Sequence, residues 1–176
     1  KPHLCFCTDP TPLEKLLFTT RVPLAFTARL NHRAFREFQG ARLYAPISLD
    51  PRENYLDRHI DSPLNFTETL YGSVSLHALQ YALAMGCSPI YLFGIDLCYL
   101  DGKMYASGAK AGVTDHCFEV EGKTTMLKWM CEKKEFEKLL KNKDNVFSMS
   151  SGLSIKGTKK CSLEQILRHE KKEYEK

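Results

Sequence analysis

The segment from Tyr71 to Tyr105 constrains the fold of this chain most strongly. It begins with a glycine and a serine, continues with small and apolar residues at helical spacing, and reaches Gly86, which ends the helical pattern. A nearly continuous apolar run, Pro89–Phe93, follows and is closed by Gly94-Ile95-Asp96. Such a run is typical of a strand in a parallel sheet that is covered on both faces. The segment therefore predicts a helix followed by a buried strand.

Shorter segments on both sides repeat this alternation of strand and helix. Strands are expected at His3–Thr8, Val22–Thr27, Arg42–Ala45 and Asn145–Met149, with a short edge strand at Leu153–Lys156. Helices are expected at Pro12–Phe18, Asn31–Gln39, Lys123–Lys141 and Ser162–Tyr174. Two polar stretches, Ile47–Leu70 and Leu97–Glu121, are expected to be long loops. The pattern predicts an α/β fold with a doubly wound, mostly parallel sheet, in a single domain that spans residues 1–176.

Composition excludes several classes of protein. The apolar fraction of 43% and the charged fraction of 26% are those of a globular protein, and no apolar run is long enough to span a membrane. The net charge of +4 comes from lysines interleaved with glutamates, which favours solvated helix faces over a nucleic-acid partner. The seven cysteines form no CxxC pair, which favours reduced thiols, a cytoplasmic location and no structural metal. Oligomerisation stays open.

Four polar features are expected at the carboxyl ends of the strands, where open α/β sheets bind their ligands. These features are Thr8-Asp9, Tyr71-Gly72-Ser73, Asp96 and Ser150-Ser151-Gly152. Gly72 and Ser73 have two interpretations: their backbone N–H groups cradle a phosphate at a helix N-terminus, or Ser73 merely caps the helix.

Asp96, His116 and two tyrosines are the other candidates. Asp96 follows a buried strand directly, where it binds a metal, orients a hydroxyl, acts as a base or caps loop amides. His116 takes a proton near neutral pH, or is simply solvated. Tyr99 and Tyr105 flank an Asp-Gly turn, and their hydroxyls either bind a phosphate or belong to a hairpin-like pair packed on the domain. These residues alone predict an α/β domain that binds a phosphorylated ligand.

The stretch YGSVSLHALQYALAMGCSPIYLFGIDLCY, residues 71–99, resembles the central block of the motility accessory factor and 6-hydroxymethylpterin diphosphokinase MptE-like family. Lys1–Pro10, residues 118–122 (FEVEG) and Phe147–Gly157 with Leu163 are similar to the family's flanking segments. The family places a Gly-x-Gly-Pro-Ser-Leu phosphate loop before the position that matches Lys1. The resemblance therefore implies a Rossmann-like fold, here without its N-terminal βα unit. Either the chain is part of a longer protein, or the domain lacks half of the residues that bind the nucleotide.

The same block is also similar to bacterial family 42 sialyltransferases, which have two tyrosines six residues apart. This second resemblance implies that Gly72 and Ser73 contact the nucleotide of a CMP-sugar donor, that Tyr99 and Tyr105 grip its phosphate, and that Asp9 touches the donor. That family's catalytic histidine corresponds to the region of Glu121, where the nearest histidine in this chain is His116.

Three functions follow as hypotheses from the resemblances. The first is a glycosyltransferase-like domain that transfers a nonulosonic acid from its CMP donor to a glycan or protein acceptor in bacterial surface or flagellar glycosylation, with His116 or Asp96 as base and no cofactor. The second is a pterin-type diphosphokinase with Asp9 and Asp96 as magnesium ligands. The third is a non-catalytic nucleotide-binding or scaffold domain.

Overall fold

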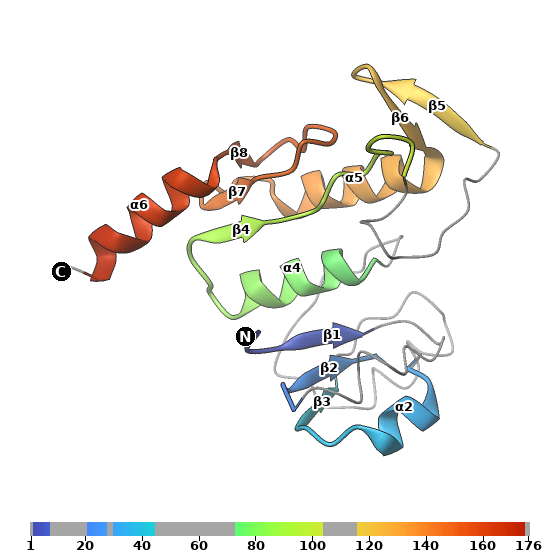
Figure 1. The fold of residues 1–176 in the computed structure, drawn as a ribbon, viewed down its shortest axis with the longest axis vertical. Coiled ribbons are helices and arrows are strands. Elements are labelled where there is room, and N and C mark those ends of the chain that lie inside the picture. Colours follow the sequence, from blue (N-terminus) through green and yellow to red (C-terminus); the bar gives the residue numbers. More distant parts are fainter. Residues whose placement is uncertain (1, 8–20, 28–29, 45–72, 104–115, 175–176) are drawn as a thin grey trace. The chain divides into compact units, whose positions relative to one another are not determined.

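The computed structural model describes residues 2–7, 21–27, 30–44, 73–103 and 116–174. They belong to two compact units, Lys1–Met85 and Gly86–Lys176, and each is described by itself (Figure 1). Each unit combines a parallel sheet with helices. The α/β class is therefore confirmed, whereas a single doubly wound domain stays a prediction.

The first unit contains a parallel sheet in the order β1-β2-β3. Its strands are β1 (Cys5–Cys7), β2 (Leu24–Phe26) and β3 (Arg42–Tyr44). Ala25 lies opposite Phe6 on one side and Leu43 on the other. Because β2 is the central strand, its residues Leu24 and Ala25 are almost fully buried.

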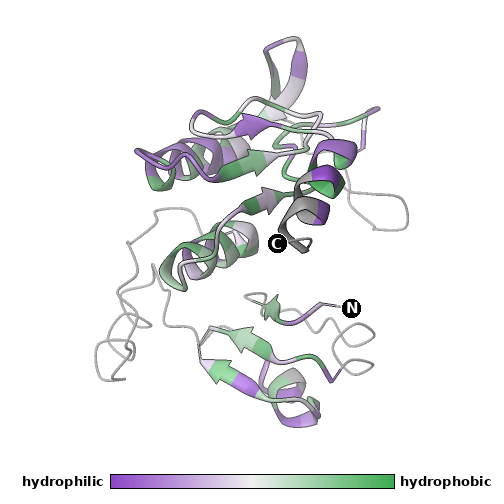
Figure 2. Ribbon diagram, turned by 90° about the vertical axis from the view of Figure 1, so that its left-hand side faces the viewer, coloured by the Kyte–Doolittle hydropathy of each residue, from purple (hydrophilic) through white to green (hydrophobic). Residues whose placement is uncertain are grey.

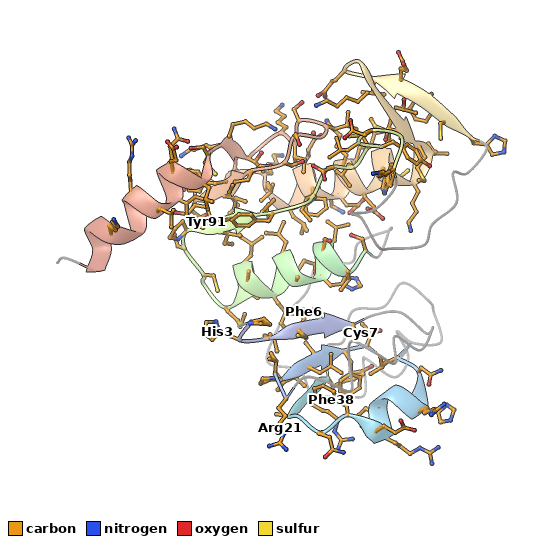
Figure 3. All side chains as sticks on the ribbon, viewed as in Figure 1. His3, Phe6, Cys7, Arg21, Phe38 and Tyr91 are labelled. Atoms are coloured by element: carbon orange, nitrogen blue, oxygen red, sulfur yellow. The ribbon has the colours of Figure 1, made fainter. Side chains whose placement is uncertain are left out.

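Apolar side chains cover both faces of this sheet. The helices are α2 (His32–Glu37) and α4 (Val74–Ala84). Successive side chains of a strand point to opposite faces, so Leu24 packs with Cys7 and Phe38 on one face, while Ala25 packs with Tyr81 of α4 on the other. The ring of Phe6, which is labelled in Figure 3, meets that of Tyr81 edge-on, with 5.1 Å between their centroids.

The second unit contains a parallel sheet in the order β4-β7-β8 and two helices. The strands are β4 (Ile90–Leu92), β7 (Val146–Ser148) and β8 (Lys159–Lys160), and the helices are α5 (Leu127–Leu139) and α6 (Leu163–Tyr174). Its most deeply buried apolar side chains are those of Phe136, Leu140, Val146 and Leu153. Hydrophobic residues dominate β4, whereas α5 carries many hydrophilic ones (Figure 2).

A hairpin in this unit corrects the sequence-based expectation of a loop up to Glu121 followed by a helix from Lys123. Strands β5 (Cys117–Val120) and β6 (Lys123–Met126) pair antiparallel. The connecting residues Glu121 and Gly122 have φ values of 53° and 67°, as a tight two-residue hairpin turn requires. The helix begins only at Leu127, which is 68% exposed instead of facing inward.

The structure also tests the expected edge strand, the state of the cysteines and the absence of a membrane-spanning helix. The edge strand at Leu153–Lys156 is wrong, because the strand that pairs with β7 is β8. The expected helix at Pro12–Phe18 and the expected loop at Ile47–Leu70 lie outside the described residues. All seven cysteines lie in the described part, and none forms a disulfide. No helix among the described residues has the length and apolar character needed to cross a membrane.

Helix α5 contains an acidic side chain at a buried position, and this gives a pH-dependent prediction. Glu132 is only 5% exposed, and burial raises the pKa of its carboxyl above the ordinary value, against a smaller opposing effect of Lys128. A raised pKa in the folded state means that stability falls as pH rises from about 4.5, the value in the unfolded chain, through the folded pKa. Above the folded pKa, the burial of the charged Glu132 carboxylate lowers the free energy of unfolding by its full amount.

We therefore expect Glu132→Gln to raise the thermal unfolding midpoint at about pH 7, because the substitution removes a buried charge. Below about pH 4.5 the substitution should have little effect, because the Glu132 carboxyl is protonated and is neutral like the glutamine that replaces it. Thermal melts across this pH range measure the difference. Glu164→Gln is the matched control, because the Glu164 side chain is 83% exposed. Equal effects of the two substitutions at neutral pH would contradict the prediction.

Candidate functional site

Two loops meet at the carboxyl edge of β4 and β7. The aspartate loop, residues 93–103, follows β4, and the serine loop, residues 149–154, follows β7. The strands are parallel, with Leu92 opposite Ser148, so both loops leave the sheet on the same side. The hydroxyl of Ser150 donates a 2.5 Å hydrogen bond to Oδ1 of Asp96. The predicted convergence of Asp96 with Ser150-Ser151-Gly152 is therefore confirmed.

The backbones of the two loops are in direct contact. A Cβ at Gly152 would lie 1.9 Å from the carbonyl oxygen of Asp96, so glycine is required at this position. The N–H of Leu153 donates to the same carbonyl oxygen at 2.8 Å, and the N–H of Gly152 donates to Oγ of Ser150 at 3.0 Å. Asp96 is therefore held through both its backbone and one carboxylate oxygen.

The other carboxylate oxygen of Asp96, Oδ2, receives no hydrogen bond from any described residue. The residue is half-buried, so its carboxylate is partly accessible from solvent. An oriented carboxylate with one unused oxygen can bind a hydroxyl, accept a proton or contribute an oxygen ligand to a cation. Among the described residues, no group of three or more His, Cys, Asp or Glu side chains is arranged to hold a metal by itself.

Strand β6 contacts both loops, in a region where a loop and a helix were expected from the sequence. Nζ of Lys123 donates to the carbonyl oxygens of Ser151 and, at 2.8 Å, of Gly152. Oγ1 of Thr125 donates to the carbonyl oxygen of Leu97 at 2.7 Å. The hairpin could have been predicted from Glu121-Gly122, a turn-forming pair that stands between two short segments of alternating polar and apolar residues.

The turn of the hairpin binds the end of the serine loop. Both carboxylate oxygens of Glu121 accept hydrogen bonds from Ser154, through its hydroxyl at 2.8 Å and its N–H at 3.0 Å. These bonds lower the pKa of Glu121 below its ordinary value. Within the aspartate loop, burial raises the pKa of the Cys98 thiol, so this cysteine is protonated at neutral pH.

Tyr99 directly precedes a tight turn. Its side chain is 8% exposed, and its ring packs edge-on against Trp129 with 4.9 Å between the centroids. Leu100 and Lys103 exchange backbone hydrogen bonds around Asp101 and Gly102, whose φ values are positive. This geometry agrees with packing of Tyr99 on the domain. Its expected contact with a phosphate stays a prediction, and Tyr105 lies outside the described residues.

Ser73 belongs to the first unit, where it caps α4. Its hydroxyl accepts a hydrogen bond from the N–H of Leu76 at 3.3 Å, so the capping interpretation is observed. The phosphate cradle stays a prediction, because Gly72 lies outside the described residues. His116 is exposed and directly precedes β5, while Asp9 is also outside the described residues.

The contact between the two loops predicts a steric effect at Gly152. Gly152→Ala places a methyl group inside the van der Waals radius of the Asp96 backbone, so the two loops must separate. We expect a loss of about 1–3 kcal/mol in the free energy of unfolding, measured by urea denaturation. Ser151→Ala is the control, because Ser151 is exposed and its carbonyl is retained. A neutral effect of Gly152→Ala would show that the loops do not approach so closely.

Comparison with known protein families identifies a family that matches the chain. The family described as 6-hydroxymethylpterin diphosphokinase MptE-like matches residues 1–102, more than half of the 176-residue chain. The matched region includes Asp96 and the whole helix–strand segment from which the resemblance was identified. Neither the curated proteins nor the solved structures contain a match to the chain. The chain belongs to the 6-hydroxymethylpterin diphosphokinase MptE-like family.

Proposed function

We propose that this chain is a nucleotide-binding transferase domain and that it transfers a pyrophosphoryl group, as the name of its family indicates. The observation that carries the proposal is Asp96, fixed by Ser150 at the carboxyl edge of a parallel strand pair. Ligands of open α/β sheets bind at such edges. The half-buried carboxylate keeps one oxygen unoccupied by described residues.

The oxygen donors of this edge fit a divalent cation. Magnesium in nucleotide-dependent enzymes is bound by one or two carboxylates together with phosphate oxygens of the substrate. Asp96 would provide one carboxylate, and the bound cation would neutralise charge on the phosphates. Ser150 would keep the Asp96 carboxylate in one orientation, because its hydroxyl already holds Oδ1.

A second candidate is transfer of a nonulosonic acid from a CMP-sugar donor to a glycan or protein acceptor, in bacterial surface or flagellar glycosylation. The eleven-residue helix α4 favours it, because its N-terminus directly follows Gly72 and Ser73 and would attract the departing phosphate. The resemblance to the sialyltransferases assigns phosphate binding to Tyr99 and Tyr105, and transfer of the acceptor's proton to His116 or Asp96. This reaction requires no metal.

Binding of ATP and of CMP, each with and without magnesium, separates these functions. Pyrophosphoryl transfer requires ATP binding that depends on magnesium, whereas the CMP-sugar reaction requires metal-independent CMP binding. A chain that binds CMP independently of metal and does not bind ATP would overturn the first proposal. Binding of neither nucleotide would leave the third function, a non-catalytic scaffold domain.

For the first function, we expect Asp96→Asn to weaken magnesium-dependent ATP binding by at least about tenfold, because the asparagine side chain lacks the negative charge that binds a cation. Calorimetric titration measures the affinity. Glu119→Gln, on the exposed strand β5, removes the same charge elsewhere in the unit and should leave the affinity unchanged. An unchanged affinity of Asp96→Asn would exclude Asp96 as a ligand of the cation.

A further inference from the structure

The ammonium group of Lys123 lies at the edge where the two loops meet. Lys123 and Thr125 are two residues apart on β6, so their side chains lie on the same face of the strand. Thr125 holds the aspartate loop through the carbonyl of Leu97, and Lys123 holds the serine loop through the carbonyls of Ser151 and Gly152. One face of β6 thus fixes both loops around Asp96.

The hydrogen bonds of Lys123 leave part of its capacity unused. An ammonium group has three N–H donors, and the two carbonyl oxygens take two of them. No carboxylate in the described part of the chain forms an ion pair with Lys123, although five other ion pairs occur there. Lys123 is half-buried, and no described residue accepts a hydrogen bond from its remaining donor, although the carboxylate of Glu121 lies close enough to interact with its charge.

The charges of Lys123 and Asp96 both act on the buried Cys98 thiol. Burial raises the pKa of that thiol most, Lys123 lowers it, and Asp96 and Glu121 raise it. A cation and carboxylates therefore lie near Cys98 at the strand edge. Such a pair suits a phosphorylated ligand, since an ammonium binds phosphate oxygens directly while a carboxylate binds them through a cation.

We propose that Lys123 binds the phosphate or pyrophosphate group of the ligand, with its third N–H as donor, while its other two N–H groups keep the serine loop in place. The proposal rests on the proposed function in requiring a phosphorylated ligand, and it assigns the anion-binding cation of the site. Lys160 strengthens the same loop from β8, because its Nζ donates to the carbonyl oxygen of Ser150 at 2.6 Å.

The test uses inorganic pyrophosphate as the probe, titrated calorimetrically into the 176-residue chain and its variants. Lys123→Met should weaken pyrophosphate binding at least about tenfold, and the remaining affinity should depend less on salt concentration, because one charge contact is lost. Lys134→Met removes an exposed positive charge from α5 and should have no effect on affinity. Thr125→Val removes the hydrogen bond to the aspartate loop without removing charge, so it should weaken pyrophosphate binding clearly less than Lys123→Met does.

A purely structural role of Lys123 gives a different result. Lys123→Met would then be less stable but would bind pyrophosphate like the wild type, or Thr125→Val would lose as much affinity as Lys123→Met, and either result overturns the proposal. If Lys123→Met does not fold, Lys123→Gln keeps amide donors for the carbonyls without the charge, and the same loss of affinity is expected. A wild-type chain that binds ATP while Lys123→Met binds pyrophosphate normally overturns this inference alone. A wild-type chain that binds neither compound overturns the proposed function as well.

Discussion

The contact between Gly152 and Asp96 is the constraint on which the arrangement of the second unit's candidate site depends. The position of a Cβ at residue 152 is already occupied by the backbone of Asp96, so only glycine lets the loops meet. Once they meet, the N–H of Leu153 reaches the Asp96 carbonyl and the Ser150 hydroxyl reaches the Asp96 carboxylate. The hydrogen bonds that orient the Asp96 carboxylate can therefore form only because residue 152 is a glycine.

The hairpin turn adds a second hold on the serine loop, and this hold depends on pH. Glu121 has a lowered pKa because Ser154 donates to its carboxylate, so the interaction is fully present above about pH 4.5 and is lost as pH falls through the lowered pKa. Glu121 is exposed, and solvent weakens an exposed charged contact. The bonds of Lys123 to the carbonyls of the same loop do not depend on protonation of a carboxylate. The loop therefore keeps both contacts with the hairpin in mild acid, and keeps the contact with Lys123 when the pH falls below the lowered pKa of Glu121.

Local sequence patterns predicted the elements whose ends carry a chemical signal. Helix α4 is an example, because Ser73 caps its start and Gly86, with a φ of 73°, follows its end. Helix α6 is another, since Ser162 and Gln165 exchange hydrogen bonds at its start. Helix α5 has no side-chain cap, and its first residue, Leu127, is apolar and yet exposed. With no signal to mark that start, the apolar periodicity of α5 extended the predicted helix into β6.

The residues of the candidate site likewise differ in whether the sequence could predict them. Asp96 and Ser150 each follow a strand, so the rule that ligands gather at carboxyl strand ends was enough to bring them together, although 54 residues separate them. Lys123 could not be identified by this rule, because it lies on a hairpin that reaches the edge from outside the parallel sheet. Its contacts are to backbone carbonyls of Ser151 and Gly152, and any residue provides such a carbonyl. No pattern of side chains in the sequence records an interaction of that kind, and the three-dimensional fold is needed to find it.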